Sequence, residues 1–149
     1  MRCVAYVSTE TRRLRQADIT DILRVSRMKN TVRRITGMLL YFDGVFLQII
    51  EGDDDAVADL LAVIRHDRRH KDLRILMEEP VTAPHFPDWS MAFLDIGALP
   101  PEERWLVRDL ALPLPTAQSD HLSHRIHRLI RSFQDMVRDN QSENPDCAR

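Results

Sequence analysis

Gln48 is the residue whose position in the sequence most needs a chemical explanation. It lies in a largely apolar segment, residues 45–51, that follows an Asp-Gly turn and is typical of a strand. Successive side chains of a strand point to opposite faces, and both faces of this strand look buried, so we expect the Gln48 amide in the interior. An unpaired buried amide costs about 1–3 kcal/mol. Gln48 should therefore have a specific hydrogen-bond partner.

Tyr6 and Asn30 are the residues that could complete a site around Gln48. Tyr6 lies in a predicted first strand, residues 2–8, which neighbours the Gln48 strand in a ferredoxin-like topology. A Tyr–Gln hydrogen bond would satisfy one end of the amide and leave the other available. Asn30, at the end of the predicted first helix, adds a second amide, although a helix C-cap is its alternative role. Together they suggest a site between two helices for the flat polar edge of a ligand; a Tyr6–Gln48 contact that only satisfies the core is the rival interpretation.

His70 ends a charged run, residues 65–70, and is followed by Lys71. A solvated helix C-terminus, where cations offset the helix dipole, is the interpretation that position favours. The rival is a cluster of donors for a ribose or a pyrophosphate.

The sequence predicts no metal site. His121, His124 and His127 recur every three residues, but no carboxylate or cysteine completes the set at a convincing spacing, so a solvated helix face is expected. Cys3 and Cys147 are the only cysteines, without a Cys-x-x-Cys pair, which argues against a disulfide scaffold and for a reducing cytoplasm. Neither a signal peptide nor a membrane-length apolar run is present.

Composition is that of a single domain of 149 residues, 44% hydrophobic and 30% charged. The net charge of −2 gives no reason to bind nucleic acid or an anionic membrane. The element order invites comparison with RNA-recognition modules, but residues 45–51 lack their basic-aromatic pattern.

The predicted elements form an α+β, ferredoxin-like sheet in the order β-α-β-β-α-β-β, with two helices on one face. Strands are expected at residues 2–8, 35–42, 45–51, 73–79 and 89–94, and helices at residues 17–29 and 53–64. A C-terminal helix pair, residues 102–110 and 119–138, carries an apolar stripe that should cover the other face or form a dimer contact. The predicted division is a domain over residues 1–95, a helical extension over residues 96–140 and a disordered tail over residues 141–149.

Five motifs in this chain resemble those of BLUF domains, the blue-light sensors that use flavin. They are Tyr6-Val7-Ser8, Asn30 ahead of Ile35-Thr36-Gly37, Phe46-Leu47-Gln48-Ile49-Ile50-Glu51-Gly52, Asp67-x-Arg69-His70, and Phe86-x-x-Trp89-x-Met91. They follow the family's order and spacing from residue 1 to about residue 95. One departure is Arg34, which stands where many relatives have glycine, and another is Lys29, where other polar residues are also common.

The resemblance implies a noncovalently bound flavin: FAD, with FMN or riboflavin as alternatives. Tyr6 would be the light-driven donor of an electron and a proton, and Gln48 would lie between Tyr6 and the ring and rearrange its amide. Asn30 would bind the pyrimidine edge of the ring. Trp89 and Met91, on the fifth strand, would move with the state of the glutamine. The other implied cofactor contacts are Ile22 and Ile64 on the ring faces and Lys29, Arg69 and His70 toward the ribityl-phosphate end.

The expectation is therefore a short photoreceptor of the bacterial cytoplasm without an attached enzyme domain. It should form a homo-oligomer through the C-terminal helices or the sheet face and act on a separate downstream protein. The signal should pass through the fifth strand and the C-terminal helices to another subunit or to that partner. A flavin-dependent redox enzyme on the same scaffold is the alternative, although no Gly-x-Gly-x-x-Gly fingerprint supports it.

Overall fold

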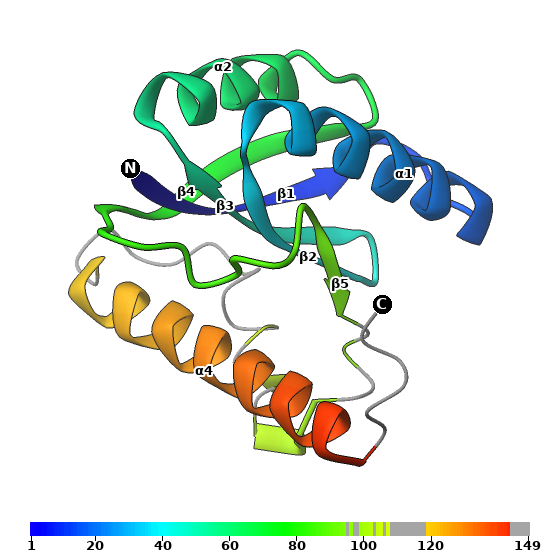
Figure 1. Ribbon diagram of the computed structural model, residues 1–149. Helices are drawn as coiled ribbons and strands as arrows, with labels where there is room; N and C mark the ends of the chain where they lie inside the picture. Colours follow the sequence, from blue (N-terminus) through cyan, green and yellow to red (C-terminus); the bar gives the residue numbers. More distant parts are fainter. Residues whose placement is uncertain (95, 97–98, 103, 106, 108–118, 144–149) are drawn as a thin grey trace.

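One five-stranded sheet organises the chain, with helices on both faces (Figure 1). The computed structural model describes all residues except 95, 97–98, 103, 106, 108–118 and 144–149. The elements are β1 (Arg2–Glu10), α1 (Gln16–Arg33), β2 (Thr36–Phe42), β3 (Val45–Gly52), α2 (Asp54–Arg65), β4 (His70–Pro80), β5 (Ala92–Leu94) and α4 (Ser119–Glu143). The strand order is β4-β1-β3-β2-β5, antiparallel except for the parallel pair of β2 and β5.

The helices form two layers around this sheet. Helices α1 and α2 cover one face and α4 covers the other (Figure 1). This arrangement confirms the predicted α+β, ferredoxin-like fold. For the first helix of the predicted C-terminal pair, residues 102–110, the structure describes residues 102, 104, 105 and 107, which are helical; the others lie outside the described part of the chain.

Helix α4 begins at the predicted Ser119 but continues to Glu143, beyond the predicted end at Arg138. The physical reason is that neither glycine nor proline interrupts residues 116–144, and Pro145 is the first residue that a helix cannot accommodate in its interior. The tail predicted over residues 141–149 therefore starts inside a helix.

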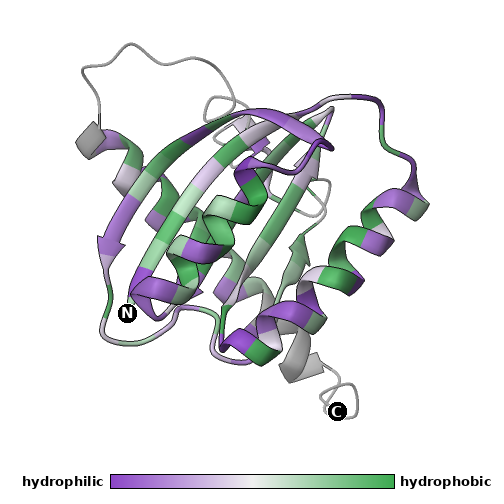
Figure 2. Ribbon diagram, turned by 90° about the horizontal axis from the view of Figure 1, so that it is seen from above, coloured by the Kyte–Doolittle hydropathy of each residue, from purple (hydrophilic) through white to green (hydrophobic). Residues whose placement is uncertain are grey.

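Burial on both faces of the sheet follows from strand alternation. Leu47 and Ile49 belong to an apolar cluster on the α4 side, while Phe46 and Ile50 belong to a second cluster under α1 and α2. Apolar and polar bands alternate along α1 and α2 in Figure 2. Gln48 shares the face of Phe46 and Ile50, so its amide is enclosed by the α1 and α2 layer.

Among the described residues, no helix is both long enough and apolar enough to cross a membrane.

Helix α1 extends past its predicted end at Lys29, which changes the role of Asn30. The helix ends at Arg33, and Arg34 follows in the left-handed conformation with φ 55°. The N–H of Arg34 donates to the carbonyls of Asn30 and Thr31. Asn30 thus lies within the helix, and the C-cap interpretation of this residue is wrong.

The fifth strand is shorter than predicted, since β5 spans Ala92–Leu94 and not residues 89–94. Trp89 and Met91 lie in the segment before it. The carbonyls of this segment accept hydrogen bonds from β2 and α1. Gly37 N–H donates to the Trp89 carbonyl at 3.0 Å, and Arg27 Nε donates to the Met91 carbonyl at 2.9 Å. These bonds hold residues 89–91 beside β2 without a regular ladder.

Candidate functional site

Tyr6 and Gln48 face each other directly across the antiparallel ladder of β1 and β3. Directly opposed residues project to the same face of a sheet, so the two side chains meet under α1 and α2. The Tyr6 hydroxyl donates a hydrogen bond to Gln48 Oε1. The other end of the amide, Nε2, donates to Met91 Sδ at 3.5 Å. The partner predicted from strand order is therefore present, and the structure adds Met91 as the second.

Met91 and Trp89 point in different directions, which the sequence left open. Met91 is buried beside Gln48, whereas Trp89 is 39% exposed. The Trp89 ring lies against Phe133 of α4, with ring centroids 6.3 Å apart. In this structure the methionine contacts the glutamine and the tryptophan contacts the helix on the opposite side of the sheet.

A cavity of about 130 Å³ opens beside Gln48, between α1 and α2. All eight residues predicted to contact a cofactor line it: Tyr6, Ile22, Lys29, Asn30, Gln48, Ile64, Arg69 and His70. Ile22 and Lys29 come from α1, and Ile64 from α2. The structure thus brings the predicted set together, while contact of each residue with a ligand stays a prediction.

Two residues that line the cavity, Ser8 and His70, carry buried polar atoms without hydrogen-bond partners among the described residues. Ser8, which also lines the cavity, is buried, and its Oγ has no hydrogen-bond partner among the described residues. The same is true of His70 Nδ1. Asn30 is buried and uses its Nδ2 to donate to the Ser90 carbonyl at 2.8 Å. Buried polar atoms are nearly always paired, so these orphans indicate that a polar ligand edge fits the cavity.

Ser8 was missed in the sequence interpretation. Its signal was available, because it lies two residues after Tyr6 on the same strand and therefore shares its face.

The outer part of the cavity carries the charges. Arg69 Nη2 pairs with Asp67 Oδ2 at 2.5 Å, and this contact is the main reason that the pKa of Asp67 is lowered. Lys29 lines the cavity as well, so two basic groups face one carboxylate there. This balance suits a ligand that carries negative charge at its outer end, such as a phosphate.

His70 does not lie at a helix C-terminus, so that interpretation is wrong. Helix α2 ends at Arg65, and His70 is the first residue of β4. The strand starts earlier than predicted because His70 and Lys71 pair with Glu10 and Thr9 of β1. Burial lowers the pKa of His70, which keeps the ring neutral at neutral pH.

The Tyr6 phenol is protonated in this environment. Complete burial raises its pKa, and the charge of Asp67 adds to the effect. A neutral phenol that donates to an amide can give up an electron and a proton together to an oxidant within reach. The cavity is therefore lined by a protonated phenol and by two amides, Gln48 and Asn30, groups that could form hydrogen bonds with the edge of a flat heterocycle.

Comparisons with known proteins identify the family of this chain. A family model described as sensors of blue-light using FAD matches residues 1–92. Photoactivated adenylate cyclase subunit beta of Euglena longa is 35% identical over 89 residues, which are 59% of this chain and 10% of that protein. The chain thus spans about a tenth of the length of the curated relatives it matches.

Solved structures of similar size share the fold. The BLUF protein BlrB in its dark state is 37% identical with a TM-score of 0.66, and the match covers 83% of this chain and 92% of that one. BlsA in its photo-activated state is 25% identical with a TM-score of 0.70, over 87% of this chain and 95% of that one. With a family model that matches 92 of its 149 residues, the chain belongs to the BLUF family of flavin-binding blue-light sensors.

Proposed function

We propose that this protein is a blue-light photoreceptor that binds FAD noncovalently in the cavity between α1 and α2, with FMN or riboflavin as alternatives. The observation that carries the proposal is the chain of contacts from Tyr6 through Gln48 to Met91 at the inner end of that cavity. Flavin, when bound, supplies the absorption of blue light and the excited-state oxidant. The ring edge would meet Asn30 and Gln48, and its faces would meet Ile22 and Ile64.

The switch is a rearrangement of the Gln48 amide. The Tyr6 hydroxyl donates to Gln48 Oε1 in this structure, and we take this arrangement, which fixes the orientation of the amide, as that of the dark state. Departure of the Tyr6 proton removes this donor and frees the oxygen end. The nitrogen end resists little, because sulfur is a weak acceptor and the contact to Met91 Sδ is 3.5 Å long. Return of the proton to Tyr6 restores the dark arrangement, so the residues undergo no net change and the protein acts as a sensor without substrate turnover.

The signal leaves through the segment before β5 and through α4. Movement of the Gln48 amide acts first on Met91, whose carbonyl is tied to Arg27 of α1. Trp89, two residues earlier, contacts Phe133 of α4. We infer that α4 passes the change to a second subunit or to a separate cytoplasmic protein, and that neither nucleic acid nor a membrane is the target.

Two substitutions test the proposed roles of Gln48 and Tyr6. Gln48→Leu should retain flavin and lose the light-induced red shift, because the amide that changes its hydrogen bond to the ring is gone. Tyr6→Phe should retain flavin and lose the photocycle, because the phenol proton is gone. Absorption difference spectra after a blue flash measure both effects.

Tyr41→Phe is the matched control, since Tyr41 is the other tyrosine of the chain and does not line the cavity. It should shift and recover as the wild type does. A normal, reversible shift in Gln48→Leu or in Tyr6→Phe would remove that residue from the mechanism.

A further inference from the structure

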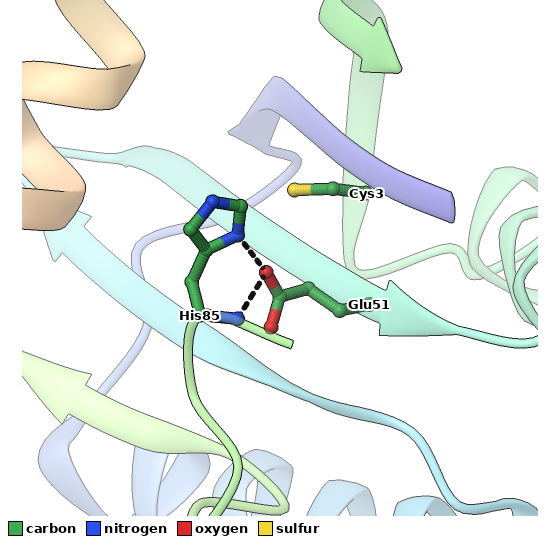
Figure 3. Close-up of side chains that lie close together, drawn as sticks. All are labelled: Cys3, Glu51 and His85. Atoms are coloured by element: carbon green, nitrogen blue, oxygen red, sulfur yellow. Dashed lines mark hydrogen bonds and ion pairs between the residues drawn. The ribbon is translucent and has the colours of Figure 1, made fainter. Parts of the chain in front are cut away.

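A second group of reactive side chains lies on the face of the sheet opposite the cavity. Cys3 and Glu51 are direct partners in the ladder of β1 and β3, so their side chains share the α4 face. His85, from the loop after β4, joins them (Figure 3). The three residues are far apart in the sequence, which is why spacing did not reveal them.

The geometry of this cluster resembles a set of metal ligands. Cys3 Sγ, one Glu51 oxygen and one His85 ring nitrogen all lie within 4.8 Å of one another. Figure 3 shows the Cys3 sulfur directed toward the His85 ring, whose Nδ1 contacts Glu51 Oε1. Ligands of a tetrahedral zinc ion are separated by about 3.3–3.8 Å, so shifts of about 1 Å would close the set around an ion.

Hydrogen bonds from neighbouring residues fix the Glu51 carboxylate in an orientation suited to binding a metal ion. Its Oε2 accepts hydrogen bonds from the Phe86 N–H at 3.1 Å and from Thr36 Oγ1 at 3.3 Å. The His85 N–H donates to Oε1 at 3.0 Å. These bonds fix the carboxylate with Oε1 toward Cys3 and His85, as outer partners do for ligands in metal sites.

A charged Cys3 sulfur would require a divalent cation at this place. Cys3 and Glu51 are both fully buried, and the Glu51 carboxylate is already satisfied by its donors from Phe86, Thr36 and His85, so the buried charge that lacks compensation is that of a Cys3 thiolate. A thiolate and a carboxylate together carry two negative charges, which one divalent cation neutralises.

We propose that Cys3, Glu51 and His85 form a Zn²⁺ site between the sheet and the loop that leads to Trp89. On binding, the Cys3 thiol loses its proton to solvent and the sulfur coordinates the ion. His85 moves its ring proton to Nε2 and coordinates through Nδ1, and Glu51 coordinates through Oε1. The mixed sulfur, nitrogen and oxygen donors suit Zn²⁺ and not Mg²⁺ or Ca²⁺, which prefer oxygen ligands. Water occupies the fourth position, and the part-exposed His85 side chain provides the path of entry.

Cobalt binding tests the proposal in the flavin-loaded protein, prepared without a histidine tag and stripped of metal. Titration with Co²⁺ in the dark should produce d–d bands at wavelengths beyond the flavin absorption, saturating at one equivalent, and Zn²⁺ should abolish them. Cys3→Ser and His85→Ala should each weaken Co²⁺ binding at least about 100-fold. Even the loss of a residue that only hydrogen-bonds to a metal ligand weakens metal binding about 10–100-fold. The flavin spectrum reports that each variant remains folded.

Two matched controls separate this site from other donors. Cys147→Ser removes the other cysteine, and His124→Ala removes an exposed histidine of α4. Both should bind Co²⁺ as the wild type does. Absence of the bands in the wild type, or unchanged binding in Cys3→Ser, would overturn the proposal, as would loss of binding in His124→Ala.

Discussion

The two ends of the Gln48 amide are held by partners of very different strength. A buried phenol donates to the oxygen, while a thioether sulfur accepts from the nitrogen. A hydrogen bond between neutral oxygen and nitrogen groups is worth about 0.5–1.5 kcal/mol net, and sulfur is a weaker acceptor. Control of the amide orientation therefore rests on the Tyr6 proton, the group that light is proposed to displace.

Ser8→Ala should have opposite effects on the empty and the flavin-loaded protein. The Ser8 hydroxyl is buried without a partner among the described residues, so its removal should raise the free energy of unfolding of the flavin-free protein by about 1 kcal/mol. If the hydroxyl pairs with the ligand, the same change should weaken flavin binding about 5–10-fold. Urea unfolding and flavin titration measure the two effects; unchanged affinity would show that Ser8 does not contact the ligand.

The chain has two tyrosines, and their ionisation should be separable. Burial, with the hydrogen bond to Glu10 next, raises the pKa of Tyr41 to about 12, and burial raises that of Tyr6 further. Both should ionise near pH 10 when unfolded. The folded state then keeps protons that the unfolded state releases, so stability should fall as the pH rises above about 10.

Ultraviolet difference titrations check this behaviour. Subtracting the Tyr41→Phe titration from the wild type should give a phenolate transition near pH 12, and subtracting the Tyr6→Phe titration should give none until the protein unfolds. Subtraction also removes the flavin background. A Tyr6 transition near pH 10 in the folded protein would contradict its complete burial.

At the scale of elements, the residue after α1, Arg34, has a backbone conformation that residues other than glycine rarely adopt. It occupies the left-handed conformation after α1, which costs a non-glycine residue about 1 kcal/mol. Arg34→Gly should therefore raise the free energy of unfolding by about 1 kcal/mol, or the melting temperature by about 3 °C. Arg33→Gly, one position earlier and still helical, should lower the free energy of unfolding by a similar amount. Equal effects of the two substitutions on thermal unfolding would contradict this account of the helix end.

The elements also show what sequence reasoning could and could not reach. The alternation of side chains along β3 correctly predicted that Gln48 is buried. The predicted order of the strands correctly placed Tyr6 beside it. The predicted start of the fifth strand at residue 89 was wrong, because residues 89–91 are held by hydrogen bonds from Gly37, Asn30 and Arg27. These donors are distant in the sequence, so local pattern does not reveal the bonds. The cluster of Cys3, Glu51 and His85 was missed for the same reason, since a loop supplies its third member.

At the scale of the whole molecule, the sheet separates a cavity on one face from α4 on the other. Phe133 of α4 contacts the loop between β4 and β5, with ring centroids 5.5 Å from Phe86 and 6.3 Å from Trp89. Gln134, the next residue, donates to the His85 carbonyl at 2.8 Å. The loop that carries Trp89 is therefore anchored to α4 at two consecutive positions.

Phe133→Leu should uncouple α4 from the photochemistry. The substitution keeps an apolar side chain but removes both ring contacts, so the free energy of unfolding should fall by about 1–3 kcal/mol. The light-induced red shift should remain, while the light-dependent change in hydrogen exchange along α4 should be lost. His124→Ala, on the exposed side of α4, should change neither. An unchanged exchange response in Phe133→Leu would show that the signal takes another route.

The absorption spectrum of the purified protein, recorded in the dark and directly after blue light, tests the central claim most directly. A rearranged Gln48 amide that strengthens the hydrogen bond to the ring should shift the flavin bands slightly to the red, and the shift should decay in darkness. Bleaching of the flavin bands would point to redox turnover instead. A spectrum that light leaves unchanged, or a colourless protein that takes up no added FAD, would contradict the account.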